Sequence, residues 1–178
     1  MSNKSFSYVL AYGSNLSRDR MKRRCPSSRV VGTADILGYR ILFKKSMTGA
    51  YATIEQDANW SVPAVVYRIN AADEIRLDRF EGCPTYYYKH HFILRIRRTN
   101  GRKTTELCSA YIMHEDRLLG KPDMDYFRLI DQGYAQYGFD LSVLDEGLAA
   151  SIGKKAAEEY IRKYLNQEVN REPEQEGS

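Results

Sequence analysis

Residues 7–24 read SYVLAYGSNLSRDRMKRR. The run 7–12 is apolar and β-prone, 13–15 is a Gly-Ser-Asn turn cluster, and a helix is predicted from Leu16 onward with Ser17 as its N-cap. The segment therefore predicts a strand, a tight loop and a helix. A loop of this kind gathers unpaired backbone N–H groups, which can hold a carboxylate or a developing oxyanion.

Length and charge limit the number of domains and the kind of ligand that this protein can have. A chain of 178 residues can form one domain with a substantial core. The formal net charge is +4, but residues 166–178 carry four Glu and one Arg, a net −3, which leaves +7 on residues 1–165. We expect a single domain over residues 1–165, followed by an acidic, disordered tail over residues 166–178. A positively charged domain favours anionic ligands without identifying them.

The cysteines and the apolar runs exclude several classes of protein. Cys25, Cys83 and Cys108 are odd in number and show no Cys-x-x-Cys spacing, so neither a disulfide framework nor a zinc site is indicated. No apolar run approaches 18 residues, and the first residues lack the apolar core of a secretory signal. These patterns predict a cytoplasmic protein without a membrane partner.

Several β-prone segments follow the first helix with little helix between them. Such an order favours antiparallel or mixed pairing over a doubly wound parallel sheet. Asn100-Gly101 is a strong hairpin signal. We predict one α+β domain with a mixed, mostly antiparallel sheet that curls toward a barrel. The expected strands are residues 30–45, 51–54, 62–69, 86–96 and 106–113, with a turn at 57–59.

A helix of about ten residues is predicted between Asn70, as the N-cap, and Gly82, as the residue after its end. Glu81 then lies at the C-terminus of this helix, where the dipole disfavours a carboxylate and raises its pKa. Such an acid suits a group that must take and return a proton near neutral pH. The alternative is an exposed Glu81 that Arg76 or Lys89 partly compensates.

Two more helices are predicted in the last third of the chain. The first covers residues 126–137 and ends at Gly138. The second is a single amphipathic helix, because apolar residues recur at intervals of four from Leu148 to Tyr164. The amphipathic helix is expected to pack on the body of the domain.

Residues 12–16, Tyr-Gly-Ser-Asn-Leu, resemble the signature loop of the γ-glutamylcyclotransferase-like (AIG2-like) family. The resemblance extends over about residues 7–140, because further pieces occur in the order and spacing of the family. These pieces are Arg24-Cys25-Pro26, the segments 52–54, 62–67 and 77–82, Tyr88 seven residues after Glu81, and the segment 122–126 with Ile130 and Gly133.

The resemblance implies a small mixed barrel-like sheet with flanking helices. It implies an enzyme that needs no metal or organic cofactor and acts on a small-molecule γ-glutamyl amide or peptide. In such a reaction the α-amine attacks the γ-carbonyl, and 5-oxoproline and an amine are released. By resemblance Glu81 is the catalytic acid–base residue. The substrate-binding residues implied are Tyr12, Gly13, Ser14, Asn15, Leu16, Tyr88 and Tyr126.

Other functions compete with this hypothesis. Ser14 or Cys83 could be the nucleophile of an amide hydrolase, although the Gly-x-Ser-x-Gly motif is absent and no paired histidine is identified besides the nearby His90 and His91. A non-catalytic module that binds a γ-glutamyl group or another carboxylate is a second alternative. Nucleic-acid binding depends only on two basic clusters and is not expected. Every γ-glutamyl compound shares the glutamyl half, so the leaving amine stays open.

Overall fold

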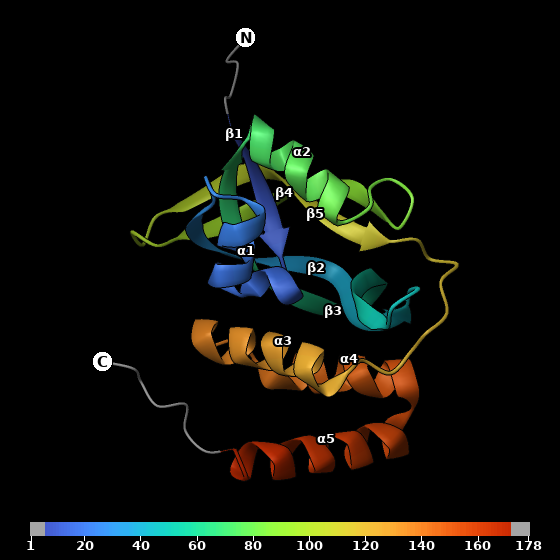
Figure 1. Cartoon of the computed structure of the whole chain (residues 1–178). Helices are drawn as coiled ribbons and strands as arrows, with labels where there is room; N and C mark the ends of the chain where they lie inside the picture. Colours follow the sequence, from blue (N-terminus) through green and yellow to red (C-terminus); the bar gives the residue numbers. More distant parts are fainter. Residues whose placement is uncertain (1–5, 172–178) are drawn as a thin grey trace.

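A computed structural model describes residues 6–171 of the protein. Within this range five strands form a closed barrel in the order β1-β3-β2-β4-β5 (Figure 1). β1 pairs with β5 in parallel, and the other pairs are antiparallel, which confirms the predicted mixed, mostly antiparallel sheet. The strands are β1 (Phe6–Ala11), β2 (Arg29–Lys45), β3 (Ala50–Asn70), β4 (Tyr87–Arg98) and β5 (Lys103–Met113).

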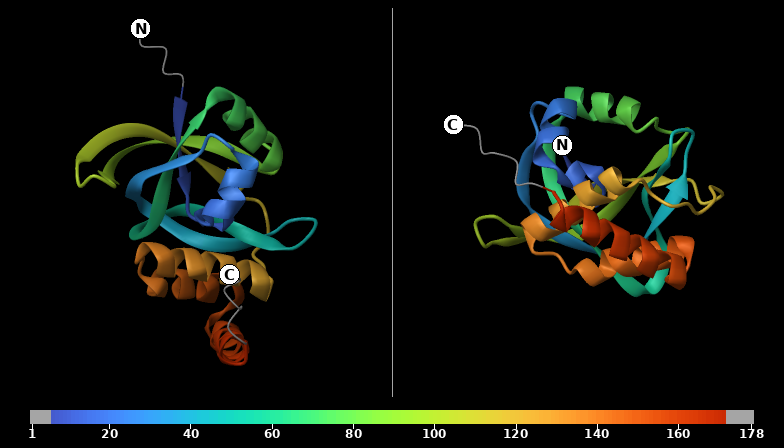
Figure 2. Two further views of the ribbon diagram at one scale, coloured as in Figure 1. Left: turned by 60° about the vertical axis from the view of Figure 1, so that its left-hand side comes forward. Right: turned by 60° about the horizontal axis from the view of Figure 1, so that its bottom comes forward.

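The helices lie in two groups around the barrel. A short 3-10 turn, α1 and α2 flank β1, whereas α3 and α4 lie on the side of β2 and β3, with α5 as an outer layer (Figure 2). In the described part of the chain no helix is long and apolar enough to span a bilayer. The helical elements are η1 (Ser14–Leu16), α1 (Arg18–Arg24), α2 (Ala71–Phe80), α3 (Met124–Tyr137), α4 (Leu141–Ile152) and α5 (Lys154–Val169).

The predicted caps of the early helices are confirmed. Ser17 accepts a hydrogen bond from the N–H of Arg20 at 3.4 Å, and Asn70 accepts one from the N–H of Asp73 at 2.9 Å. Gly82 follows the end of α2 with a φ of +64°, a left-handed conformation that suits glycine. Local capping chemistry therefore fixes where the chain enters and leaves α2.

The predicted turn at residues 57–59 is wrong, because β3 continues through it from Ala50 to Asn70. The N–H of Asn59 donates to the Asp57 carboxylate at 3.1 Å, as in an Asx-turn. The pairing with β2 shifts register nearby, between Leu37 and Tyr39. The turn-forming residues therefore make a local irregularity in one long strand and do not separate two strands.

The predicted single last helix is also wrong. Gly153, with a φ of +89°, separates α4 from α5, and a residue in this conformation interrupts a right-handed helix. The helix α5 then extends to Val169, into the segment expected to be a disordered tail. Glu168 accepts a hydrogen bond from Arg128 of α3, which anchors the end of α5. Residues 172–178 of that expected tail lie outside the described residues.

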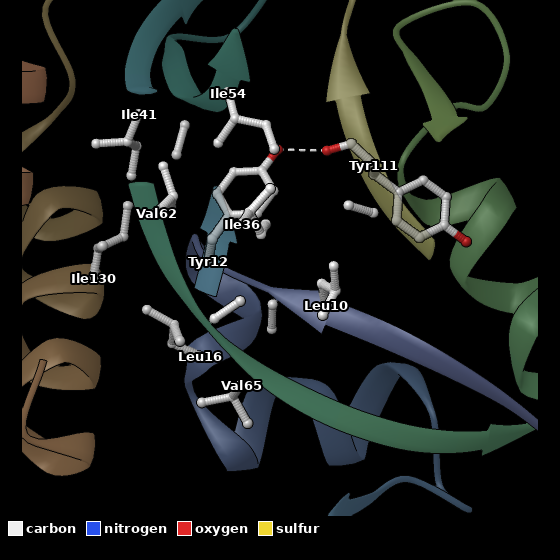
Figure 3. Close-up of a cluster of buried hydrophobic side chains, with 14 of the residues drawn as sticks. Leu10, Tyr12, Leu16, Ile36, Ile41, Ile54, Val62, Val65, Tyr111 and Ile130 are labelled. Carbon is white, nitrogen blue, oxygen red and sulfur yellow. Dashed lines mark hydrogen bonds between the residues drawn. The ribbon is translucent and has the colours of Figure 1, made fainter. Parts of the chain in front are cut away.

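The loop after β1 is anchored in the hydrophobic core through Leu16, which lies in the same buried cluster as Ile130 (Figure 3). Leu16 has no exposed surface and packs against α3 at Gly133, where a Cβ would lie only 2.6 Å from the Cβ of Leu16. Ile130 lies on the same helix as Gly133. Close packing of this kind restricts the backbone conformation of residues 13–15, which directly precede Leu16.

Candidate active site

A cavity of about 500 Å³ lies where the loop after β1 meets the end of α2. The hairpin between β2 and β3, the start of β4 and the first turn of α3 complete its walls. Residues from distant parts of the sequence therefore share one concave site, as ligand sites commonly require. Of the residues predicted to form the site, the cavity lining contains Tyr12, Gly13, Ser14, Asn15, Glu81 and Tyr126.

Glu81 follows the last residue of α2 and lines this cavity. Its N–H donates to the carbonyl of Leu77 at 2.9 Å, so the helix still fixes the backbone at this position. The carboxylate oxygen Oε1 accepts a hydrogen bond of 3.0 Å from Nδ2 of Asn15. The predicted acid and the predicted loop are therefore in direct contact.

Burial raises the pKa of Glu81, and the hydrogen bond from Asn15 and the positive charge of Arg24 oppose this effect. The predicted direction of the shift agrees, but burial is its main cause, whereas the sequence argument depended on the helix terminus. Arg76 and Lys89 do not compensate Glu81. Arg76 pairs with Asp73 at 2.8 Å, and Lys89 pairs with Glu74 and Asp78, each at 2.8 Å.

Residues 13–15 line the cavity, and their backbone N–H groups stand at the start of the 3-10 turn, where N–H groups have no partner within the helix. Among residues 6–171 no backbone acceptor outside the regular elements is found for the N–H groups of Gly13, Ser14 and Asn15. The N–H of Leu16 is different, because it donates to the carbonyl of Gly13 at 3.0 Å. Three donors of the loop thus remain for an anionic or carbonyl group, while Leu16 serves as the hydrophobic anchor.

Buried tyrosine hydroxyls form another part of the cavity wall. The Tyr126 oxygen accepts the N–H of Ala52 at 3.0 Å, and the Tyr87 hydroxyl donates to the carbonyl of Ala52 at 3.1 Å. The Tyr12 hydroxyl donates to the carbonyl of Tyr111 (Figure 3). Burial raises the pKa of Tyr12, Tyr87 and Tyr126, so these hydroxyls stay protonated at neutral pH.

The Tyr126 hydroxyl hydrogen is free to donate to a ligand, whereas the Tyr12 and Tyr87 hydroxyls already donate to backbone carbonyls. The Tyr126 oxygen is the acceptor in the contact with Ala52, so the contact does not use the hydroxyl hydrogen. A Cβ on Gly13 would lie 3.6 Å from the Tyr126 oxygen, which places this hydroxyl beside the loop. Tyr126 can therefore donate to the same part of a ligand as the loop N–H groups.

The structure does not bring Tyr88 to the cavity. Its hydroxyl donates to the carboxylate of Glu115, and its side chain lines a separate hollow with Glu55 and His90. Neighbouring residues of a strand face opposite ways, so Tyr87 lines the cavity at the position expected for Tyr88. Alternation along the strand indicates that one of the two faces inward, but the choice depends on how β4 joins the barrel.

Arg24 lines the cavity, although the sequence analysis did not name it among the site residues. Its Nη1 donates to Oγ of Ser14 at 3.2 Å and to Oδ1 of Asn15. The guanidinium lies over the ring of Phe80, 3.7 Å from its centroid. Burial lowers the pKa of Arg24, which still remains a cation. The sequence signal that could have pointed to Arg24 is its place in Arg24-Cys25-Pro26, one of the pieces that resemble the family.

The alternative nucleophiles lack the expected partners. Ser14 Oγ accepts from Arg24, and no histidine among the described residues lines the cavity. His114 contacts the carbonyl of Pro84 at 2.6 Å, and Cys83 lies outside the lining. Across residues 6–171 no group of three His, Cys, Asp or Glu side chains could hold a metal ion. The chemistry available in the cavity is that of a carboxylate, amides, hydroxyls and arginines.

Comparison with known proteins decides the family. The family model described as Gamma-glutamyl cyclotransferase, AIG2-like, matches residues 9–133. The chain belongs to this family. Glu81 and the loop from Tyr12 to Leu16 both lie in the matched region. A human relative named Gamma-glutamylcyclotransferase is 30% identical over 144 residues, which cover 77% of this chain and 74% of that protein.

Solved structures show the same fold at lower sequence identity. A structure titled Gamma-glutamyl cyclotransferase has a TM-score of 0.66 at 24% identity and covers 97% of this chain and 92% of its own. The human protein loc79017 has a TM-score of 0.65 at 24% identity, with 98% and 93% covered. A yeast γ-glutamyl cyclotransferase described as specific to glutathione has a TM-score of 0.60 at 15% identity, with 90% and 97% covered.

Proposed function

We propose that the protein converts a γ-glutamyl amide or peptide into 5-oxoproline and a free amine. The observation that carries this proposal is the contact between Glu81 and Asn15 inside one cavity, beside three unpaired loop N–H groups. Family membership supports an enzyme that acts on small-molecule γ-glutamyl substrates.

The substrate carries its own nucleophile. The α-amine attacks the γ-carbonyl carbon, a new C–N bond closes a five-membered lactam, and the C–N bond to the leaving amine breaks. Because the attack is intramolecular, a well-oriented substrate can gain about 7–11 kcal/mol of the barrier. The protein therefore has to fold the substrate, assist proton transfer from the attacking nitrogen to the leaving nitrogen, and stabilise an oxyanion.

Glu81 is the group that we assign to the proton transfer. In its ionised form it takes a proton from the α-ammonium, which frees the lone pair for attack, and it then returns the proton to the leaving nitrogen. The attacking nitrogen loses its second proton as the lactam forms, and the released amine takes up a proton and leaves the site as an ammonium ion. Burial raises the pKa of Glu81 toward the working pH, and this makes both steps accessible to the same carboxyl group.

The loop and Tyr126 supply the donors for the oxyanion. When the γ-carbonyl becomes tetrahedral, its oxygen gains negative charge, and the N–H groups of Gly13, Ser14 and Asn15 offer donors in the same cavity. The Tyr126 hydroxyl is a further donor beside Gly13. Loss of one oxyanion donor elsewhere costs about 3 kcal/mol, so the backbone loop can account for a large part of the rate.

The test is release of 5-oxoproline from a panel of γ-glutamyl amines and γ-glutamyl peptides. We expect Glu81→Gln to lower the rate at least about a hundredfold, the size typical of general acid–base catalysis. Glu146→Gln, an exposed position on α4, is the matched control and should keep the wild-type rate. Near wild-type turnover in a folded Glu81→Gln protein would refute the assignment. Wild-type protein that binds the panel without releasing product would favour a binding module.

A second experiment, with a metal chelator, tests whether the reaction is independent of metal ions. The reaction exchanges one C–N bond for another and needs no electron transfer, so we expect the same rate after dialysis against EDTA. A rate that falls with EDTA and returns with an added divalent cation would contradict this part of the proposal.

A further inference from the structure

The side chain of Asn15 lies between two groups of opposite charge. Its Oδ1 accepts from Nη1 of Arg24, and its Nδ2 donates to Oε1 of Glu81 at 3.0 Å. A guanidinium has donors and no acceptor, whereas an ionised carboxylate has acceptors and no donor. Only one orientation of the amide satisfies both neighbours. Arg24 therefore determines which end of Asn15 faces Glu81.

The same amide could turn by half a rotation if Arg24 were absent. It would then present Oδ1 to Glu81, an arrangement that suits a protonated carboxyl group and repels an ionised one. The orientation of Asn15 is thus coupled to the protonation of Glu81. A cation on the far side of Asn15 biases the pair toward the ionised carboxylate.

We propose that Arg24 is a positioning residue, which holds the NH₂ group of Asn15 toward Glu81 and so keeps Glu81 in the ionised form from which proton abstraction begins. This inference rests on the acid–base role of Glu81 in the proposed function. Arg24 acts through Asn15 and is not assigned a contact with the substrate.

Arg24 is itself fixed in place by its surroundings. It is the last residue of α1, where the negative end of the helix dipole favours a cation. Its guanidinium is stacked on Phe80, the residue before Glu81, and donates to Ser14 at 3.2 Å. The ends of α1 and α2 therefore meet at this stack, which ties the cation, the amide and the acid into one cluster.

Other titratable groups surround Glu81. Arg24 is the cation whose charge favours the ionised carboxylate, while burial acts against it. The hydroxyls that interact with Glu81 have a raised pKa and carry no charge at neutral pH. The facing groups are Tyr12 after β1, Tyr87 on β4, Tyr111 on β5, Tyr126 on α3, Cys25 after α1, and Arg20 and Arg79 in the same cavity lining.

The test measures the pKa of Glu81 directly, by NMR titration of its side-chain carboxyl carbon. It compares wild type, Arg24→Met, Asn15→Ala and the double variant. We expect Arg24→Met to raise the pKa by about one unit, because Asn15 is then no longer held with its NH₂ group toward the carboxylate, and the acid limb of kcat/KM should move equally. In the Asn15→Ala background the same substitution should produce less than half of that shift. Arg23→Met, an exposed position on the same helix, should leave the pKa within about 0.2 units.

Equal shifts in both backgrounds would overturn the inference, because they would show a direct charge effect that bypasses Asn15. If Arg24→Met does not fold, Arg24→Lys gives the same comparison with the charge retained. A shift in Arg24→Lys that disappears in the Asn15→Ala background supports positioning, and no shift or equal shifts overturn it. The titration needs no turnover, so it remains decisive even if the wild-type protein releases no 5-oxoproline.

Discussion

Nδ2 of Asn15 donates a 3.0 Å hydrogen bond to Oε1 of Glu81, although the two residues are 66 positions apart in the sequence. Asn15 belongs to the turn after β1, and Glu81 follows the last residue of α2. The bond therefore joins the two elements whose ends form the cavity. It also makes the charge state of Glu81 sensitive to what stands at position 15.

Asn15→Asp tests this sensitivity by replacing the donor with a carboxylate. Two carboxylates in contact do not both ionise easily, so the pKa of Glu81 rises further. We expect the acid limb of the pH profile to move up by about one unit, so that activity lost on the acid side is recovered at higher pH. The measurement is kcat/KM for 5-oxoproline release from pH 5 to 9. Asn59→Asp, exposed on β3, adds the same charge and should leave the profile unchanged. An unshifted profile in Asn15→Asp would contradict the coupling.

The raised pKa of Glu81 also predicts how stability depends on pH. Burial makes the folded protein hold the Glu81 proton to a higher pH than the unfolded chain does. Stability is therefore lost as the pH rises from the unfolded pKa, about 4.3, through the folded pKa. A glutamine at this position carries no such proton, so the stability of Glu81→Gln relative to wild type should be greater at pH 7 than at pH 4.

Urea unfolding at the two pH values measures this difference. Glu146→Gln corrects for the loss of one negative charge from the protein, because its side chain is exposed on α4. A Glu81→Gln protein with the same relative stability at pH 4 and pH 7 would show that the folded and unfolded pKa values are alike. Burial would then not be the cause that we assign.

Substitutions at the adjacent residues Tyr87 and Tyr88 should affect activity differently. The Tyr87 hydroxyl donates to Ala52 at 3.1 Å in the cavity wall, whereas the Tyr88 hydroxyl donates to Glu115 outside the cavity. Tyr87→Phe removes a hydrogen bond worth about 1 kcal/mol from the wall, and we expect kcat/KM to fall several-fold. Tyr88→Phe should change kcat/KM less than about twofold, within the effect of about 0.5 kcal/mol usual for sites away from the chemistry. The reverse order would return Tyr88 to the substrate-binding role predicted from the sequence.

The parts of the site that the sequence predicts are those with local signals. Asn70 and Gly82 cap α2 and so place Glu81, and the Gly-Ser-Asn turn follows directly from the strand before it. These signals act over a few residues, and tertiary contacts did not override them. The mostly antiparallel sheet could be predicted because successive β-prone segments follow one another with little helix between them.

The parts that the sequence missed depend on distant contacts or on weak breakers. Arg24 gains its role from Asn15 and Phe80, and no pattern around residue 24 encodes this pairing. The inward choice between Tyr87 and Tyr88 depends on the closure of the barrel. At Gly153 the spacing of apolar residues continues from α4 into α5. Periodicity alone therefore predicts one continuous helix.

Gly133→Ala tests whether the packing under the loop controls the site above it. A Cβ at this position would lie 2.6 Å from the Cβ of Leu16, so either Leu16 or α3 must shift. Overpacking costs about 1–3 kcal/mol, and the gain of about 1 kcal/mol from alanine in a helix offsets part of it, so we expect a net loss of about 1 kcal/mol. Because Leu16 anchors the loop, turnover should fall more than substrate affinity, as expected when oxyanion donors are displaced. Gln132→Ala, exposed on the same helix, is the control for helix propensity. A Gly133→Ala protein with wild-type stability and wild-type kcat would show that the loop donors do not depend on this contact.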